Sequence, residues 1–164
     1  MAVIKVNEME LFSAALLSIV VVLPPAGQAL RIAALWIAWL IVMLFHVELG
    51  LMPLFHGRSV QIETDVPVAR LPRLFMAMLL YLMVPVLAML LAFHAAADPQ
   101  SWSAASSWRG AQWWLSLLYT LTNLIHLTAD IRIPDARRDQ IVLMSFLTLI
   151  GLMLNVETWL WWRG

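Results

Sequence analysis

Residues 112–130 read QWWLSLLYTLTNLIHLTAD, and this stretch decides the fold. Most of its residues are apolar, yet polar side chains recur in it at intervals of three and four residues. Because an α-helix turns once every 3.6 residues, side chains at these intervals share one face. Polar groups at membrane depth are costly and face a protein interior or a water-filled cavity. The stretch therefore predicts a membrane helix whose inward polar face carries Ser116, Tyr119, Asn123, His126 and Asp130.

The composition of the whole chain favours lipid as its surroundings. Of its 164 residues, 63% are hydrophobic and 12% are charged, whereas an ordinary soluble domain has about 25% charged residues. A soluble fold of this size cannot hide so much apolar surface from water. We therefore expect an integral membrane protein with a single transmembrane domain over residues 1–164.

Apolar segments separated by polar turns predict an all-α membrane bundle of five transmembrane helices. The first segment is short, because a bilayer core takes about 20 apolar residues, and the bundle has four spans if that segment does not cross. In the third span, Pro85 frees a backbone carbonyl that a neighbouring group must satisfy. The approximate bounds of the expected spans are 9–25, 30–55, 74–95, 112–131 and 141–162.

The positions of lysine and arginine predict how the chain is threaded. Loops on the cytoplasmic side of a membrane carry an excess of these residues. Five spans put seven of them on the side of the N-terminus and three on the other side. We therefore expect a protein of the bacterial inner (cytoplasmic) membrane with its N-terminus in the cytoplasm. The seven are Lys5, Arg58, Arg70, Arg73, Arg132, Arg137 and Arg138, and the three are Arg31, Arg109 and Arg163.

Two histidines are candidates for one site. The second span has a face formed by Trp36, Trp39, Met43 and His46, and in this threading it runs parallel to the fourth span. If the two helices are neighbours, His46 and His126 lie at nearby depths. Glu48 is two residues beyond His46 and points to a roughly opposite side of its helix.

Three functions would use such a site. Two neutral imidazoles, those of His46 and His126, can ligate the iron of a haem b. His126 and Asp130, one helical turn apart, can hold a divalent metal ion, with His46 or His56 completing the shell. A proton or solute relay is the third alternative, because intramembrane ionisable residues often mark such routes. Its members would be Asn123, His126, Asp130, Glu48 and His56.

A structural role explains the same polar residues without any ligand. Polar side chains hold membrane helices together, each contributing about 0.6 kcal/mol on average. Short helices form a thin bundle, which gains stability by packing on other subunits, and Glu48 offers a second polar contact surface. Our first interpretation is therefore an accessory or scaffold subunit of a larger membrane complex, with a polar site between the second and fourth helices. The metal or haem protein and the translocating protein are its alternatives.

Several functions lack their residues in this chain. The formal net charge is zero, so nucleic-acid binding has no electrostatic basis. The chain has no cysteine, which excludes disulfides, thiolate metal sites and thiol nucleophiles. It also has no G-x-S-x-G, P-loop or H-E-x-x-H motif, so we do not expect an enzyme of these classes. The expected partners are the lipid bilayer and other membrane protein subunits.

Overall fold

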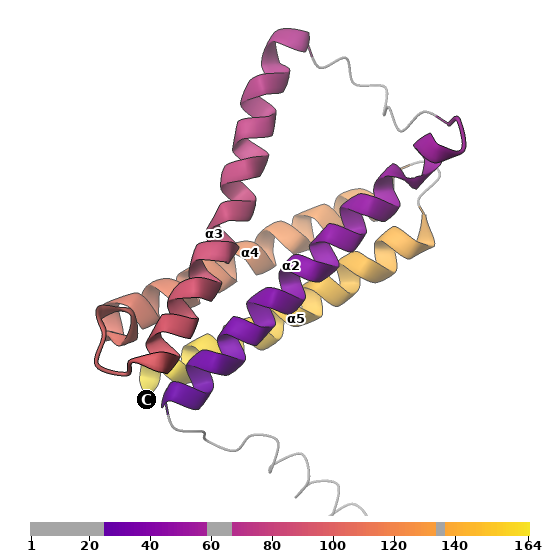
Figure 1. Cartoon of the computed structure of the whole chain (residues 1–164). Helices are drawn as coiled ribbons and strands as arrows, with labels where there is room; N and C mark the ends of the chain where they lie inside the picture. The colour runs from indigo at the N-terminus through magenta and orange to yellow at the C-terminus, as the bar shows by residue number, and fades with distance from the viewer. Residues whose placement is uncertain (1–24, 59–66, 134–136) are drawn as a thin grey trace, which may run out of the picture.

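The computed structural model describes residues 25–58, 67–133 and 137–164, and four long helices account for most of them. Figure 1 shows α2 and α4 lying lengthwise along α5, while α3 joins them only over its C-terminal half; α2 and α4 run in one direction and α3 and α5 in the other. Short 3-10 turns precede α3 and α4, and the described ranges contain no strand. The helices are α2 (Pro25–Phe55), α3 (Leu71–Ala97), α4 (Ser106–Arg132) and α5 (Arg138–Arg163), and the turns are Val68–Arg70 and Trp102–Ala104.

The all-helical fold is confirmed, but a count of five helices is not supported. The expected spans 30–55, 74–95, 112–131 and 141–162 each fall inside one of the four helices. The expected span 9–25 lies outside the described residues except for its last residue. That residue, Pro25, begins α2, where a missing backbone N–H breaks no helical hydrogen bond.

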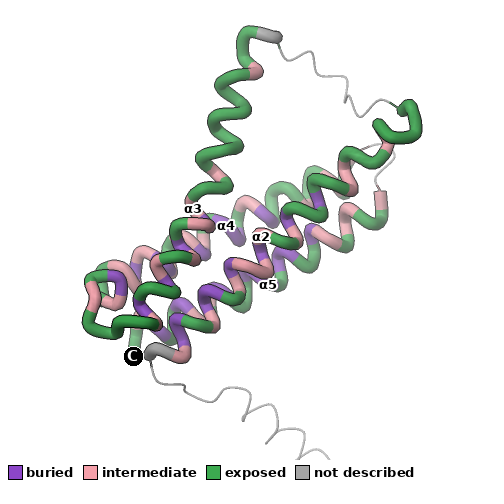
Figure 2. Tube along the Cα trace, in the orientation of Figure 1, coloured by how far each residue is buried: buried purple, intermediate pink, exposed green. Residues whose placement is uncertain are grey.

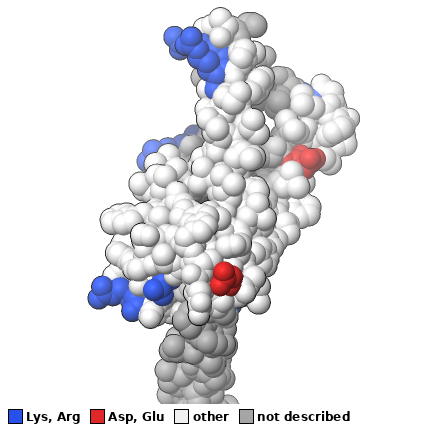
Figure 3. All heavy atoms as spheres, turned by 60° about the vertical axis from the view of Figure 1, so that its left-hand side comes forward, with Lys and Arg blue, Asp and Glu red and all other residues white. Residues whose placement is uncertain are grey.

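Three of the four helices are long and apolar enough to cross a membrane: α2 from Gly27, α3 and α5. This finding indicates a membrane protein. We expected α4 to cross as well, and it is as long as α3, at 27 residues. It is not among the three because polar side chains interrupt its apolar sequence. Most of the surface visible in Figure 3 is uncharged, as an apolar environment requires.

Aromatic side chains fill the space between α2, α3 and α4. Trp36 and Trp39 of α2 are fully buried and meet Tyr119 of α4 edge to face, with ring centroids 5.6 and 5.3 Å apart. Tyr81 of α3 lies against the same Tyr119 ring at 4.7 Å. Such pairs add about 0.5–1.5 kcal/mol each beyond the area they bury. The aromatic face expected on the second span is therefore a core face.

Helix α5 packs against both α2 and α4. Its contact with α4 is close at Gly151, where an added Cβ would lie 2.6 Å from Thr120 Oγ1. Small residues allow membrane helices to approach in this way. Near its C-terminal end α5 also holds α2 through an ion pair, in which Arg31 Nη2 lies 2.8 Å from Glu157 Oε1.

Two prolines lie inside helices, and a distant part of the chain satisfies the carbonyl that each one frees. A proline has no N–H to donate to the carbonyl four residues earlier. Pro85 thereby frees the Tyr81 carbonyl, which accepts from the Tyr119 hydroxyl at 2.5 Å. Pro53 frees the carbonyl of Leu49, which accepts from Arg137 Nη1 at 2.7 Å. The expectation that a neighbouring group satisfies the carbonyl freed by Pro85 is confirmed.

Replacing Tyr119 by Phe removes the only hydroxyl that reaches the Tyr81 carbonyl from α4. We expect this change to lower the free energy of unfolding by about 1–3 kcal/mol, because a buried carbonyl is left unpaired. Pro85→Ala restores the N–H that pairs with this carbonyl within α3, so the same change should cost much less in that background. The wild type, Tyr119→Phe, Pro85→Ala and the double variant are unfolded in detergent micelles. Helical circular dichroism follows their unfolding and measures the coupling between the two changes.

Tyr81→Phe is the control, because the Tyr81 hydroxyl bonds the Thr122 side chain at 2.8 Å and no main-chain group depends on it. If Tyr119→Phe lowered the free energy of unfolding equally in the wild-type and Pro85→Ala backgrounds, the explanation would be contradicted.

Candidate functional site

The polar face of α4 points into the bundle along most of its length. Ser116, Tyr119 and Asn123 are buried, as expected. Ser116 Oγ lies 3.1 Å from Thr158 Oγ1 of α5, and Asn123 Nδ2 donates to the Leu147 carbonyl of α5 at 3.4 Å. These bonds join α4 to α5, so this part of the face connects helices.

Gln112 belongs to the same face and was missed from sequence. It is fully buried, its Oε1 accepts from Trp36 Nε1 at 3.0 Å, and its Nε2 donates to the Ala88 carbonyl at 2.7 Å. One side chain thus links α2, α3 and α4. Its position four residues before Ser116 continues the polar spacing and was the signal that could have found it.

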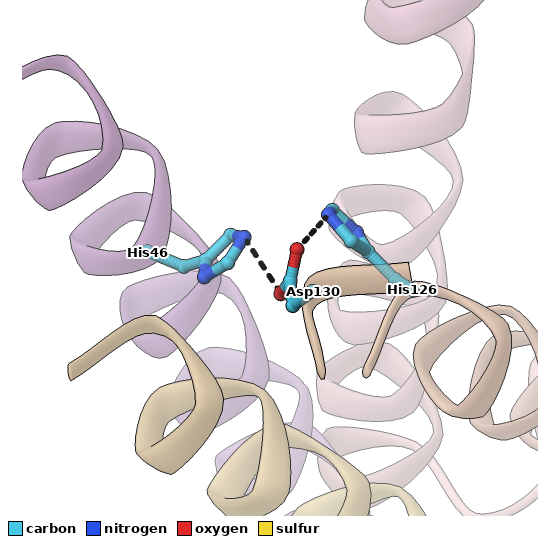
Figure 4. A group of neighbouring side chains, drawn as sticks. All are labelled: His46, His126 and Asp130. Atoms are coloured by element: carbon cyan, nitrogen blue, oxygen red, sulfur yellow. Dashed lines mark ion pairs between the residues drawn. The ribbon is translucent and has the colours of Figure 1, made fainter. Parts of the chain in front are cut away.

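At the other end of the face, the structure brings together His46 of α2 with His126 and Asp130 of α4 (Figure 4). His126 Nε2 lies 3.6 Å from Asp130 Oδ1, and His46 Nε2 lies 4.0 Å from Asp130 Oδ2. The two imidazole centroids are 5.0 Å apart with their planes perpendicular. The sequence predicted nearby depths for the two histidines only if α2 and α4 were neighbours, and the structure shows that their side chains meet.

The spacing of these three side chains is close to that of a metal site. One ligand atom from each residue lies within 4.8 Å of the other two. In a tetrahedral zinc site with bonds of about 2.1 Å, ligand atoms are roughly 3.4 Å apart. Drawing the three atoms together by about 1 Å would therefore bring them to bonding distance of one ion. Small side-chain rotations are enough for that movement.

The Asp130 carboxylate has an unusual environment in the centre of this cluster. Its side chain is 13% exposed, and Oδ2 is buried with no hydrogen-bond partner. His46 Nε2 lies 4.0 Å from Oδ2, which is too far for a hydrogen bond. A buried carboxylate oxygen without a partner is costly. Asp130 needs a cation, and the structure offers the two histidines rather than Arg137, which pairs with Asp139.

Exposure differs between the two histidines. The side chain of His46 is 9% exposed, whereas that of His126 is 48% exposed. The cluster is therefore closed on the side of α2 and open on the side of His126. The half-exposed ring of His126 is the part of the cluster most accessible to a ligand.

Helix α5 supports the cluster from behind. The Gln140 amide is assigned with its nitrogen toward His46, because the opposite assignment places its oxygen against acceptors and its nitrogen against a donor. In this assignment Gln140 donates to His46 Nδ1 at 2.6 Å and to the His46 carbonyl at 3.1 Å, and its oxygen accepts from the Gly50 N–H at 3.0 Å. Gln140 was not predicted from sequence, because it follows a mixed-charge turn without any regular pattern. Only the packing of α5 against α2 places it here.

Two other predicted members of the site lie apart from the cluster. Glu48 of α2 and His56, in the turn after α2, are exposed and are not among the three grouped side chains. His46, not His56, is thus the residue placed to complete a shell with His126 and Asp130. In the described part of the chain, the polar bonds along α4 and α5 occur in separate pairs and do not join Glu157 to Asp130, so they form no continuous relay.

The arrangement suits a single ion better than a haem. Two axial imidazoles must face each other across the macrocycle, one on each side of the iron. Here a carboxylate bridges the two rings, which are 5.0 Å apart and perpendicular. A macrocycle between them would require α2 and α4 to separate and Asp130 to leave.

No protein-family model matches the chain, and no curated protein or solved structure is detectably similar to it. A function for this chain must therefore be argued from the geometry of its own residues.

Proposed function

We propose that this chain is an integral membrane protein that binds one divalent transition-metal ion through His46, His126 and Asp130. The observation that supports the proposal best is the Asp130 carboxylate, whose buried Oδ2 lacks a partner and faces an imidazole 4.0 Å away. An ion bonded to both would supply the missing positive charge. In the threading expected from sequence, this site lies in the cytoplasmic half of the membrane.

The donor set indicates which ions suit the site. Two imidazoles and one carboxylate suit zinc, iron(II) and related ions, whereas magnesium and calcium prefer oxygen ligands alone. Three protein ligands leave at least one coordination position for water, a substrate or another protein. Structural zinc sites use four protein ligands and catalytic ones use three, so the arrangement favours a site that exchanges ligands over a purely structural one.

The test is zinc binding to the detergent-purified, metal-stripped protein, measured by competition with a chromophoric chelator. We expect one zinc ion per chain. His126→Ala and Asp130→Asn should weaken binding by more than the 10–100-fold typical of losing an outer hydrogen-bonding partner, because each removes a direct ligand. His94→Ala is the matched control. The His94 ring bonds Ser103 and is not one of the three side chains of the cluster.

A wild-type protein without stoichiometric zinc would refute the proposal. Equal losses of affinity for His94→Ala and His126→Ala would do the same, because they would show binding that does not depend on the cluster.

A second candidate function is the accessory subunit of a larger membrane complex, and the course of α3 favours it. The N-terminal half of α3 diverges from the other helices, and Figure 2 shows it exposed on all sides. Every residue from 72 to 80 is exposed. A helix packed on a bundle normally buries one face, so this half has room for a partner helix all round. The two functions are compatible, because a partner can also supply the open metal position.

If this chain binds a partner through α3, shortening a large exposed side chain of α3 should weaken that binding. Leu79 of α3 and Leu149 of α5 are 53% and 51% exposed, so they form a matched pair. We expect Leu79→Ala to reduce co-purification of a stoichiometric membrane partner in mild detergent and Leu149→Ala to leave it unchanged. Native mass and the ratio of the bound proteins report the result. A single monodisperse species for the wild-type chain would speak against a complex.

The proposed threading has a direct test because the chain lacks cysteine. Each introduced cysteine then reports one position alone. We expect Ser107→Cys, before the main part of α4, to react with a membrane-impermeant maleimide on intact cells. His56→Cys, at the end of α2, should react only after the membrane is permeabilised. The opposite pattern would reverse the proposed orientation, and reaction of both on intact cells would show that α3, the helix between the two positions, does not cross.

A further inference from the structure

Gln140 connects the ring of His46 to the backbone of α2. With the amide assigned from its hydrogen-bonding partners, its nitrogen lies 2.6 Å from His46 Nδ1, while its oxygen accepts from the Gly50 N–H at 3.0 Å. The same nitrogen also donates to the His46 carbonyl at 3.1 Å. These three contacts hold the amide in a single orientation, because turning it would place its oxygen against a carbonyl and its nitrogen against an N–H.

This orientation determines which nitrogen of His46 carries hydrogen. In a neutral imidazole one ring nitrogen donates and the other accepts. Since Gln140 donates to Nδ1, that nitrogen must be the acceptor, and the hydrogen lies on Nε2, which faces Asp130 Oδ2 at 4.0 Å. A metal ion bonds to the lone pair of a neutral ring nitrogen. In this tautomer Nε2 has no lone pair to offer.

Binding of an ion at Nε2 therefore requires a different state of Gln140. The hydrogen must move from Nε2 to Nδ1, which leaves the charge of the ring unchanged. Nδ1–H then needs an acceptor, and a half-turn of the Gln140 amide supplies its oxygen. Ligating histidines almost always donate their second N–H to such an acceptor. The half-turn breaks the bonds to the His46 carbonyl and the Gly50 N–H, so it opposes metal binding.

We infer that Gln140 is a positioning residue that selects the tautomer of His46 and thereby sets how tightly the cluster of His46, His126 and Asp130 binds a metal ion. The inference rests on the proposed function for its metal-binding part. Its tautomer part concerns the metal-free protein alone. Affinity is then set from α5, by a residue that does not touch the ion.

The Gln140→Glu variant distinguishes the two tautomers of His46. A carboxylate only accepts, so it can pair with both His46 Nδ1–H and the Gly50 N–H without any rotation. One of its oxygens faces the His46 carbonyl, as the oxygen of the turned Gln140 amide also does, but unlike that amide it keeps the bond to the Gly50 N–H. We expect the ring of His46 to change from Nε2–H to Nδ1–H in the metal-free protein and zinc affinity to rise about tenfold. Gln140→Met is the control of similar length that neither donates nor accepts, and its zinc affinity should be at least tenfold below that of the Glu variant.

The tautomer is measured by ring nitrogen chemical shifts in protein labelled with ¹⁵N-histidine, with His46→Gln identifying the signal. Zinc affinity is measured by chelator competition on the same samples. An Nδ1–H tautomer in the metal-free wild-type protein would overturn the inference, and this arm does not depend on the folding of any Gln140 variant. The same tautomer in wild type and Gln140→Glu would also overturn it, as would a changed tautomer with unchanged zinc affinity.

The two proposals fail differently. If wild-type protein binds no zinc, the proposed metal function fails and the inferred control of affinity fails with it, whatever the tautomer. If wild type binds zinc and His126→Ala does not, while Gln140→Glu resembles wild type in both measurements, only the role of Gln140 is refuted.

Discussion

The structure depends on satisfying backbone and side-chain polar groups in surroundings that offer little water. Two prolines make this constraint visible, because each removes one hydrogen bond from the interior of an apolar helix. The Tyr119 hydroxyl donates to the carbonyl freed by Pro85, and the guanidinium of Arg137 donates to the one freed by Pro53. Tyr119 belongs to α4, and Arg137 is the residue that immediately precedes α5, so each local defect is satisfied by a distant part of the chain.

The same constraint explains why the most polar helix is hydrogen-bonded to each of the other three. Helix α4 is too polar to count among the candidate spans, yet its polar groups find partners on every neighbouring helix. Gln112 bonds to α2 and α3, Tyr119 to α3, and Ser116 and Asn123 to α5. Helix α4 packs lengthwise on α5, and its other side exposes apolar side chains such as Trp114, Leu118 and Ile125. A helix that lipid alone would not favour is thereby stabilised by protein contacts.

Asp130 is the acidic member of the polar face of α4, and it is the centre of the candidate site. Two oxygens of this face are buried and unpaired, Asn123 Oδ1 and Asp130 Oδ2, and the Asp130 oxygen belongs to a carboxylate that lies between two imidazoles. An orphaned carboxylate has a real energetic cost, and a cation at this point would remove it. The half-exposed side chain of His126 leaves that point open on one side, while Gln140 and Arg137 brace α2 against α5 on the other.

The sequence by itself determined the helical class of the protein, the approximate positions of four helices and the faces of α2 and α4 that point inward. These follow from local physics: apolar length, the 3.6-residue period and the loss of an N–H at proline. It predicted nearby depths for His46 and His126 only on the condition that their helices are neighbours. What only the tertiary structure decided is how the helices are arranged around one another. The distance from His46 to Asp130, the close contact at Gly151 and the position of Gln140 depend on side chains that are far apart in sequence, and no local pattern encodes which helices become neighbours.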